Sequence, residues 1–252
     1  MRSRTKHLGL AIGLACAGGL AVWASRSAPP PLKTGPDPAQ VAAARALLAQ
    51  VHLAYAAPVT LAVDYEVLPG PEGGDVLDSQ RGVVVRQDDL QYWRIGDVEV
   101  LQTEGLIASA DPGAQELTVR DAATDAGLTT DAASLAATVE RQLSACLQVT
   151  VDRSERGLQR INLDCPASRF THIELEIAEP RALLSRIVLD VRETTGVDRQ
   201  TEHPRMVITY QPLDAIPDDV HLNLAQLVRQ QGNSLVPGGA YEGYALVDLR
   251  AR

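Results

Sequence analysis

The sequence predicts an α+β protein in which one large, curved antiparallel sheet, an incomplete β-barrel, wraps around one or two helices. Only two long segments show helical periodicity, whereas about eleven short segments alternate apolar and polar residues as strands do. Tight turns separate these strands, which is typical of an antiparallel meander. A sheet of that many strands must curl or split, and amphipathic helices suit its apolar side.

The N-terminal residues have the features of an export signal. Three basic residues precede an apolar run over residues 8–22, and a small residue follows at a fitting distance. We expect a signal peptide over residues 1–24 and a proline-rich linker over residues 25–36. The run is short for a membrane span, but an uncleaved signal anchor stays open as an alternative. Lipidation at Cys16 is disfavoured because the apolar run continues past it.

Export implies a periplasmic protein, either free or anchored in the inner membrane, with residues 8–24 as its only membrane contact. Two cysteines then remain, Cys146 and Cys165. In an oxidising compartment an even pair predicts a disulfide. The segment between them is a hairpin that would bring its ends together, and closing a loop of this size stabilises by about 3 kcal/mol.

The first helix is expected to begin at Asp37, since Asp is a favourable N-cap and Pro38 suits the first helical position. The residues of its apolar stripe recur at steps of three and four: Val41, Ala44, Leu48, Val51 and Tyr55. Pro58 ends the helix. Residues 59–67 then alternate apolar and polar side chains, which predicts a strand with one buried face.

Turns divide the following residues into further strands. The expected ranges are 82–86, 90–95, 98–103, 106–110 and 116–120. A second helix, capped by Thr130 or Asp131, would carry one apolar face, formed by Leu135, Val139, Leu143 and Cys146. Later strands are expected over residues 170–177, 185–192 and 205–210. The tail is less regular: residues 218–230 suit a short helix or a strand, and residues 241–250 suit a final strand.

This order of elements is similar to the LolA/LolB-like superfamily of periplasmic lipoprotein carriers. The motifs that carry the resemblance are a strand ending at Arg86, the aromatic–Arg strand Tyr92-Trp93-Arg94, a hairpin marked by Gly105, and strands around Asp111-Pro112. The resemblance implies that residues 37–252 form a single half-barrel domain whose hydrophobic cavity shields acyl chains. Carrier members of the family have an Arg-Pro pair at the first strand's end, whereas Gln87 follows Arg86 here.

We therefore expect an exported, non-catalytic protein that binds or carries an apolar ligand, either a lipid or the acyl chain of a lipoprotein. The alternative is an envelope interaction module, tethered or soluble, with a filled core, no ligand and an envelope protein as partner. Eight residues are expected to line the cavity: Val41, Leu48, Val51, Leu61, Val63, Tyr65, Arg86 and Tyr92. Tyr92 and Trp93 are neighbours on one strand, so they face opposite sides.

Composition and motifs argue against other classes of function. The net charge of −9 disfavours nucleic-acid binding, and the absence of lysine beyond Lys33 excludes a P-loop or Schiff-base lysine. No hydrolase elbow or zinc-protease motif occurs. His172 and Glu174 should share the solvated strand face, and residues 218–221 should form a solvated loop. We expect no cofactor, metal or catalytic residue; a hydrolase using Asp218 and His221 is a distant third hypothesis.

Overall fold

The computed structural model describes residues 35–122, 138–154, 157–194, 201–202, 204–232 and 234–250. The expected signal peptide, most of the linker, the helix cap at Thr130 or Asp131, and Leu135 lie outside the described residues. Within the described ranges, no helix is both long and apolar enough to cross a membrane.

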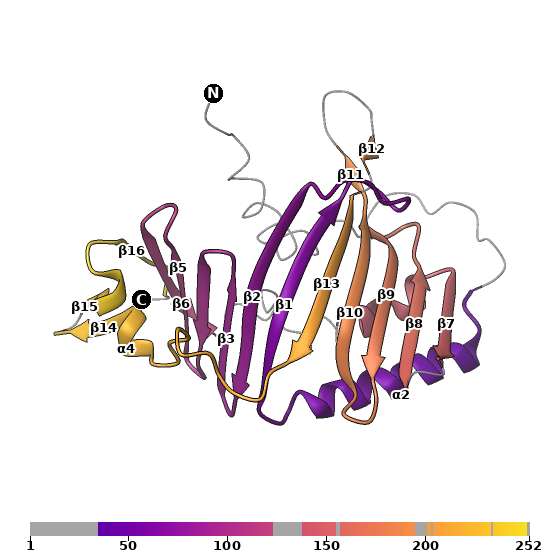
Figure 1. Cartoon of the computed structure of the whole chain (residues 1–252), viewed down its shortest axis with the longest axis horizontal. Coiled ribbons are helices and arrows are strands. Elements are labelled where there is room, and N and C mark those ends of the chain that lie inside the picture. Colours follow the sequence, from indigo (N-terminus) through magenta and orange to yellow (C-terminus); the bar gives the residue numbers. More distant parts are fainter. Residues whose placement is uncertain are drawn as a thin grey trace.

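Twelve strands form one curved, open sheet in the order β16-β6-β5-β4-β3-β2-β1-β13-β10-β9-β8-β7 (Figure 1). Its neighbours pair antiparallel, except that β16 runs parallel to β6. The strands are β1 (Val59–Leu68), β2 (Asp78–Gln87), β3 (Leu90–Ile95), β4 (Val98–Gln102), β5 (Leu106–Asp111), β6 (Glu116–Asp121), β7 (Gln148–Arg153), β8 (Leu158–Asp164), β9 (Phe170–Ala178), β10 (Leu183–Val191), β13 (Arg205–Pro212) and β16 (Ala245–Asp248). The expected fold class is confirmed.

Smaller elements complete the described chain. Two short hairpins pair β11 (Glu193–Thr194) with β12 (Thr201–Glu202) and β14 (Val228–Gln231) with β15 (Ser234–Pro237). The helical elements include α2 (Pro38–Ala54), α4 (Leu224–Leu227), and the 3-10 turns η3 (Leu143–Ala145) and η4 (Gly239–Tyr241). Residues 138–142, within the second expected helix, are also α-helical. The ambiguous tail thus contains both a helical turn and a strand. The helical turn and the strand follow each other directly in the chain, so both expected forms occur.

The start of α2 is as the sequence predicts. The carboxylate of Asp37 accepts a hydrogen bond from the Ala39 amide at 2.9 Å, which satisfies one of the amides left free at a helix N-terminus. The helix contacts β7 and β10, and Figure 1 shows it alongside β7–β10 and away from β3–β6. The disulfide between Cys146 and Cys165 is present and closes the β7–β8 hairpin, as expected.

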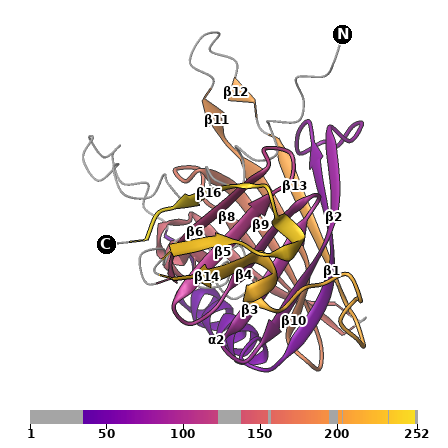
Figure 2. The ribbon, with the colours of Figure 1, turned by 90° about the vertical axis from the view of Figure 1, so that its left-hand side faces the viewer.

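The sheet carries two apolar cores, and they lie on opposite faces. Leu61 faces α2, and its cross-strand partner Val84 faces the same way; we call this side the helix face. The neighbours of Val84 on the strand, Val83 and Val85, face the other side, which we call the tail face because residues 213–250 cover it. Figure 2 shows α4 and β14 of this tail in front of β3, β4 and β5.

The first core joins α2 to six neighbouring strands on the helix face: β1, β13, β10, β9, β8 and β7. It includes Leu48, Leu61, Ile161, Leu175 and Ile187, all 0–2% exposed. The second core joins β2–β6 to the tail through Val85, Tyr92, Leu101, Val119 and Leu227. Each half of the sheet is therefore covered on a different side.

Candidate functional site

The structure brings most of the expected cavity residues together, but as a packed core. Four of them, Leu48, Val51, Leu61 and Val63, are 0–3% exposed in the core beneath α2. Val41 and Tyr65 pack against the same core. Whether any of these residues contacts a ligand stays a prediction.

The two remaining residues lie elsewhere. Arg86 is on the helix face at the end of β2, paired across the strands with Val59 and Gln91. Tyr92 is fully buried on the tail face, within the second core. Its neighbour Trp93 is on the helix face and half-buried. Sequence reasoning correctly placed these two aromatic residues on opposite sides, but it had no means to tell which of them faces the helix side.

Apolar side chains on the helix face continue past the core onto β2, β3 and β4. Val84, Trp93 and Val100 are direct cross-strand partners in one row. In the next row Gly82 pairs with Ile95, and Ile95 pairs with Val98. We call Val84, Trp93, Ile95 and Val98 the β2–β4 patch. All four are half-buried, and only Val84 packs against either core.

Gly82 leaves a bare position beside this patch. A Cβ atom built there would lie 1.9 Å from the carbonyl oxygen of Arg94, so no larger residue fits between β2 and β3 without moving the backbone. The row that contains Ile95 and Val98 therefore passes through a position with no side chain before it reaches Val63 on β1.

A polar row borders the patch at the end where β1 begins. Its residues are Arg86, Gln91 and Gln102, which are successive cross-strand partners on β2 to β4 and share the helix face with the patch. The row continues through the apolar Ile107 on β5 to Arg120 on β6. The Oε1 atoms of Gln91 and Gln102 are buried and accept no hydrogen bond from the residues that the structure describes. A polar surface thus lies directly beside an apolar one.

The tail face holds two polar contacts that fix the C-terminal segment, one buried and one exposed. The Tyr241 hydroxyl donates to Glu99 Oε2 at 2.7 Å, and Arg94 Nη2 donates to Asp219 Oδ2 at 2.7 Å. Burial, together with the nearby Glu99 carboxylate, raises the pKa values of Tyr92 and Tyr241. The hydrogen bond from Arg94 lowers the pKa of Asp219. These contacts hold the tail on β3 and β4.

A surface cavity of about 490 Å³ lies by the turn between β3 and β4. Its lining residues are Arg81, Gly82, Arg94, Gly96, Asp97, Glu99 and Pro112. Arg81 pairs with Asp64 at 3.3 Å, and Arg94 pairs with Asp219. Since carboxylates already balance both arginines, the lining offers little net attraction to an anionic ligand.

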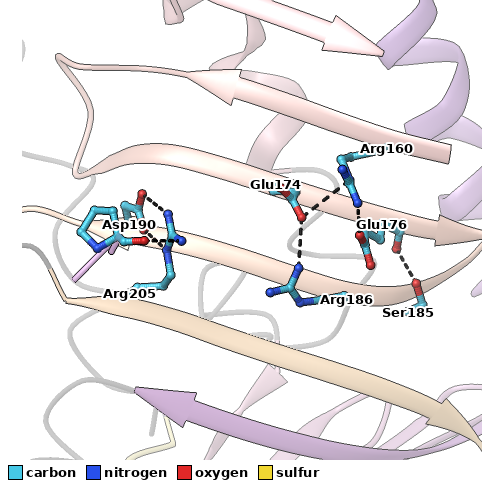
Figure 3. Close-up of polar contacts among 8 residues, drawn as sticks. Arg160, Glu174, Glu176, Ser185, Arg186, Asp190 and Arg205 are labelled. Atoms are coloured by element: carbon cyan, nitrogen blue, oxygen red, sulfur yellow. Dashed lines mark hydrogen bonds and ion pairs between the residues drawn. The ribbon is translucent and has the colours of Figure 1, made fainter. Parts of the chain in front are cut away.

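Glu174 of β9 belongs to an ion-pair network on the tail side of the sheet (Figure 3), whereas His172 Nδ1 lies 3.9 Å from Asp164 Oδ1. Glu174 Oε1 lies 3.2 Å from Arg186 Nη1 and 3.7 Å from Arg160 Nε. Asp190, which is 5% exposed, is held by two nitrogens of Arg205 at 2.7 and 2.9 Å. The carboxylate of Glu174 thus faces arginines, and no group of three metal-ligating side chains occurs in the described part of the chain.

Residues 218–221, the loop of the hydrolase hypothesis, help to hold the tail on the sheet. Asp219 is bound to Arg94, and its side chain is 65% exposed. Sequence reasoning treated this loop as solvated and missed its role in docking the tail. Arg94 and Asp219 are 125 residues apart, so no local signal connects them.

No family model matches the chain, and no curated protein matches it. Solved structures do match. An uncharacterized conserved protein from Thermus thermophilus is 12% identical, with 82% of this chain and 99% of that chain covered and a TM-score of 0.42. A LolA superfamily protein from Nitrosomonas europaea is 10% identical, with 69% and 95% covered and a TM-score of 0.29.

The lipoprotein LppX of Mycobacterium tuberculosis is 11% identical, with 71% of this chain and 99% of that chain covered and a TM-score of 0.35. At these identities and TM-scores, the likeness identifies neither a ligand nor a partner for this chain.

Proposed function

We propose that this protein binds a lipid or acyl chain on the β2–β4 patch and does so without catalysis, as a single exported domain over residues 37–252. The observation that carries the proposal is the offset between the two cores. The tail covers β2–β6 on one face, whereas α2 covers β7–β10 on the other. The apolar patch on the helix face of β2–β4 belongs to neither core, apart from Val84.

The patch has the size and chemistry for an acyl chain. Strands in a sheet lie about 4.8 Å apart, so the patch from β2 to β4 spans roughly 10 Å across the strands. Aliphatic side chains dominate it, and Trp93 adds one flat aromatic surface. Each methylene group taken out of water contributes about 0.8 kcal/mol. A chain that covered several methylenes here would bind appreciably even with one side open.

This site lies beside α2 and not beneath it. The core residues of α2 are Ala44, Leu47, Leu48 and Val51, and all are 0–3% exposed against the sheet. Packing this close supports the filled core of the alternative hypothesis, the envelope interaction module, for that half of the molecule. The β2–β4 patch is what favours a ligand over that alternative.

Fluorescence of Trp93 tests the proposal. The full chain, which has two tryptophans, is titrated with a brominated fatty acid and with its unbrominated parent. We expect quenching by the brominated chain only, and we expect it to disappear in Trp93→Phe. Val98→Asp should weaken binding by placing a charge in the patch. Val76→Asp, the same change at a loop residue that is 49% exposed, is the matched control and should bind as the parent does.

Native mass spectrometry provides the second measurement. Protein isolated without detergent should carry added mass that matches a lipid. A clean apo mass together with no quenching would contradict the proposed function and favour the interaction module.

A further inference from the structure

The polar row beside the β2–β4 patch has a composition that an apolar-chain site alone does not require. Three of its members stand two residues along a strand from a member of the apolar row: Arg86 from Val84, Gln91 from Trp93, and Gln102 from Val100. Because alternate residues share a face, the two rows lie next to each other. A molecule with an apolar chain on one row would place its polar end on the other.

Two amide oxygens in this row are buried without a hydrogen-bond partner among the described residues. They are the Oε1 atoms of Gln91 and Gln102, which are direct cross-strand partners. Leaving a buried acceptor unpaired costs about 1–3 kcal/mol, so such groups are uncommon in stable interiors. Two side by side indicate a position that a ligand group completes.

The geometry of an amide limits which kinds of ligand group could pair with Gln91 and Gln102. Rotating either side chain amide by half a turn exchanges Oε1 for the NH2 group and leaves an unpaired donor in the same place. A hydroxyl group satisfies either orientation, because it both donates and accepts. Arg86, the direct cross-strand partner of Gln91, adds positive charge beside the amides, and guanidinium groups bind phosphate well.

We propose that Gln91 and Gln102 recognise the hydroxyl groups of an anionic lipid headgroup, a phosphodiester linked to a polyol, while its acyl chain lies on the β2–β4 patch. This inference rests on the proposed function and specifies its ligand. Phosphatidylglycerol has this chemistry. Phosphatidic acid has the phosphate without the polyol, and phosphatidylcholine has neither hydroxyl groups nor net charge in its headgroup.

The test measures which lipid the full chain takes up. The protein is incubated separately with vesicles of each of these three lipids and separated from them, and the retained lipid is quantified by mass spectrometry. We expect about three- to tenfold more phosphatidylglycerol than phosphatidic acid, the factor that corresponds to one or two ordinary hydrogen bonds. Soluble glycerol phosphate should not displace the lipid, since it lacks the chain.

Two variants and one control assign the preference to the row. Gln91→Leu and Gln102→Leu should lose the preference for phosphatidylglycerol yet retain phosphatidic acid. Both should unfold at the parent temperature or above it, because each removes an unpaired buried acceptor. Gln87→Leu makes the same change at an exposed residue of β2 and should keep the preference.

The outcomes separate the two proposals. Equal retention of phosphatidylglycerol and phosphatidic acid, or an unchanged preference in both row variants, would overturn the headgroup assignment and leave acyl-chain binding in place. Retention of no lipid at all, with no quenching of Trp93, would overturn both.

Discussion

Removing the Tyr241 hydroxyl should loosen the C-terminal tail by a predictable amount. The hydroxyl donates to Glu99 Oε2 at 2.7 Å, and the two residues are 7% and 9% exposed. The next cation, Arg94, is 3.9 Å from the other oxygen of the carboxylate. A hydrogen bond to a charged group contributes about 1.5–3 kcal/mol. Tyr241→Phe should therefore lower the free energy of unfolding by that amount and Tm by roughly 3–12 °C.

Urea denaturation and thermal melting measure the change. Tyr244→Phe is the matched control, because its ring lies 5.2 Å from that of Tyr241 and its hydroxyl makes no hydrogen bond to a described residue. A double-mutant cycle with Glu99→Gln isolates the contribution of the pair. A loss below about 0.5 kcal/mol in Tyr241→Phe, or one equal to that of Tyr244→Phe, would refute the reasoning.

Three further results are expected. Replacing Cys146 and Cys165 together by serine should lower the free energy of unfolding by about 3 kcal/mol in urea, and an unchanged midpoint would count against the loop-closure argument. Asp37→Ala should cost about 1 kcal/mol by the same measurement, whereas Asp37→Asn should cost far less because asparagine also caps helices. Since Arg94 lowers the folded-state pKa of Asp219 below its usual 3.8, the stabilisation is present above that pH and is lost as the pH falls through the folded-state value. The difference between the parent and Asp219→Asn should therefore shrink in acid, and a constant difference down to about pH 2 would contradict this.

Much of the strand pattern could be predicted because apolar and polar residues alternate along each strand, and this alternation is visible within a short segment of sequence. The range expected for β3, residues 90–95, matches the strand observed, and those of β1 and β4 differ by a single residue. Asp37 and Pro38 specify the start of α2 by their own backbone preferences. Turns rich in glycine, proline and aspartate mark the strand ends equally well.

The division of the sheet between two cores could not be predicted in the same way. Alternation shows that Tyr92 and Trp93 face opposite sides, but not which of those sides meets α2. That choice depends on register across several strands and on the tail, which returns from residues 213–250 to cover β2–β6. The strand β16, which joins β6 in parallel, also requires a long-range return.

The candidate site escaped sequence reasoning for a related reason. Gln91 and Gln102 look like ordinary polar residues at strand ends, and only their pairing places them in one row. Their significance comes from burial without a partner among the described residues. No single segment of the sequence carries that information.

The two cores are separated at the boundary between β1 and β2. Val59, Leu61 and Val63 of β1 belong to one core, and Val83 and Val85 of β2 belong to the other. Backbone pairing and the contact of Val84 connect the two halves across this line on the helix face. The unbroken antiparallel pairing of β1 with β2, from Val59 opposite Arg86 to Val67 opposite Asp78, therefore carries most of the connection between the two cores.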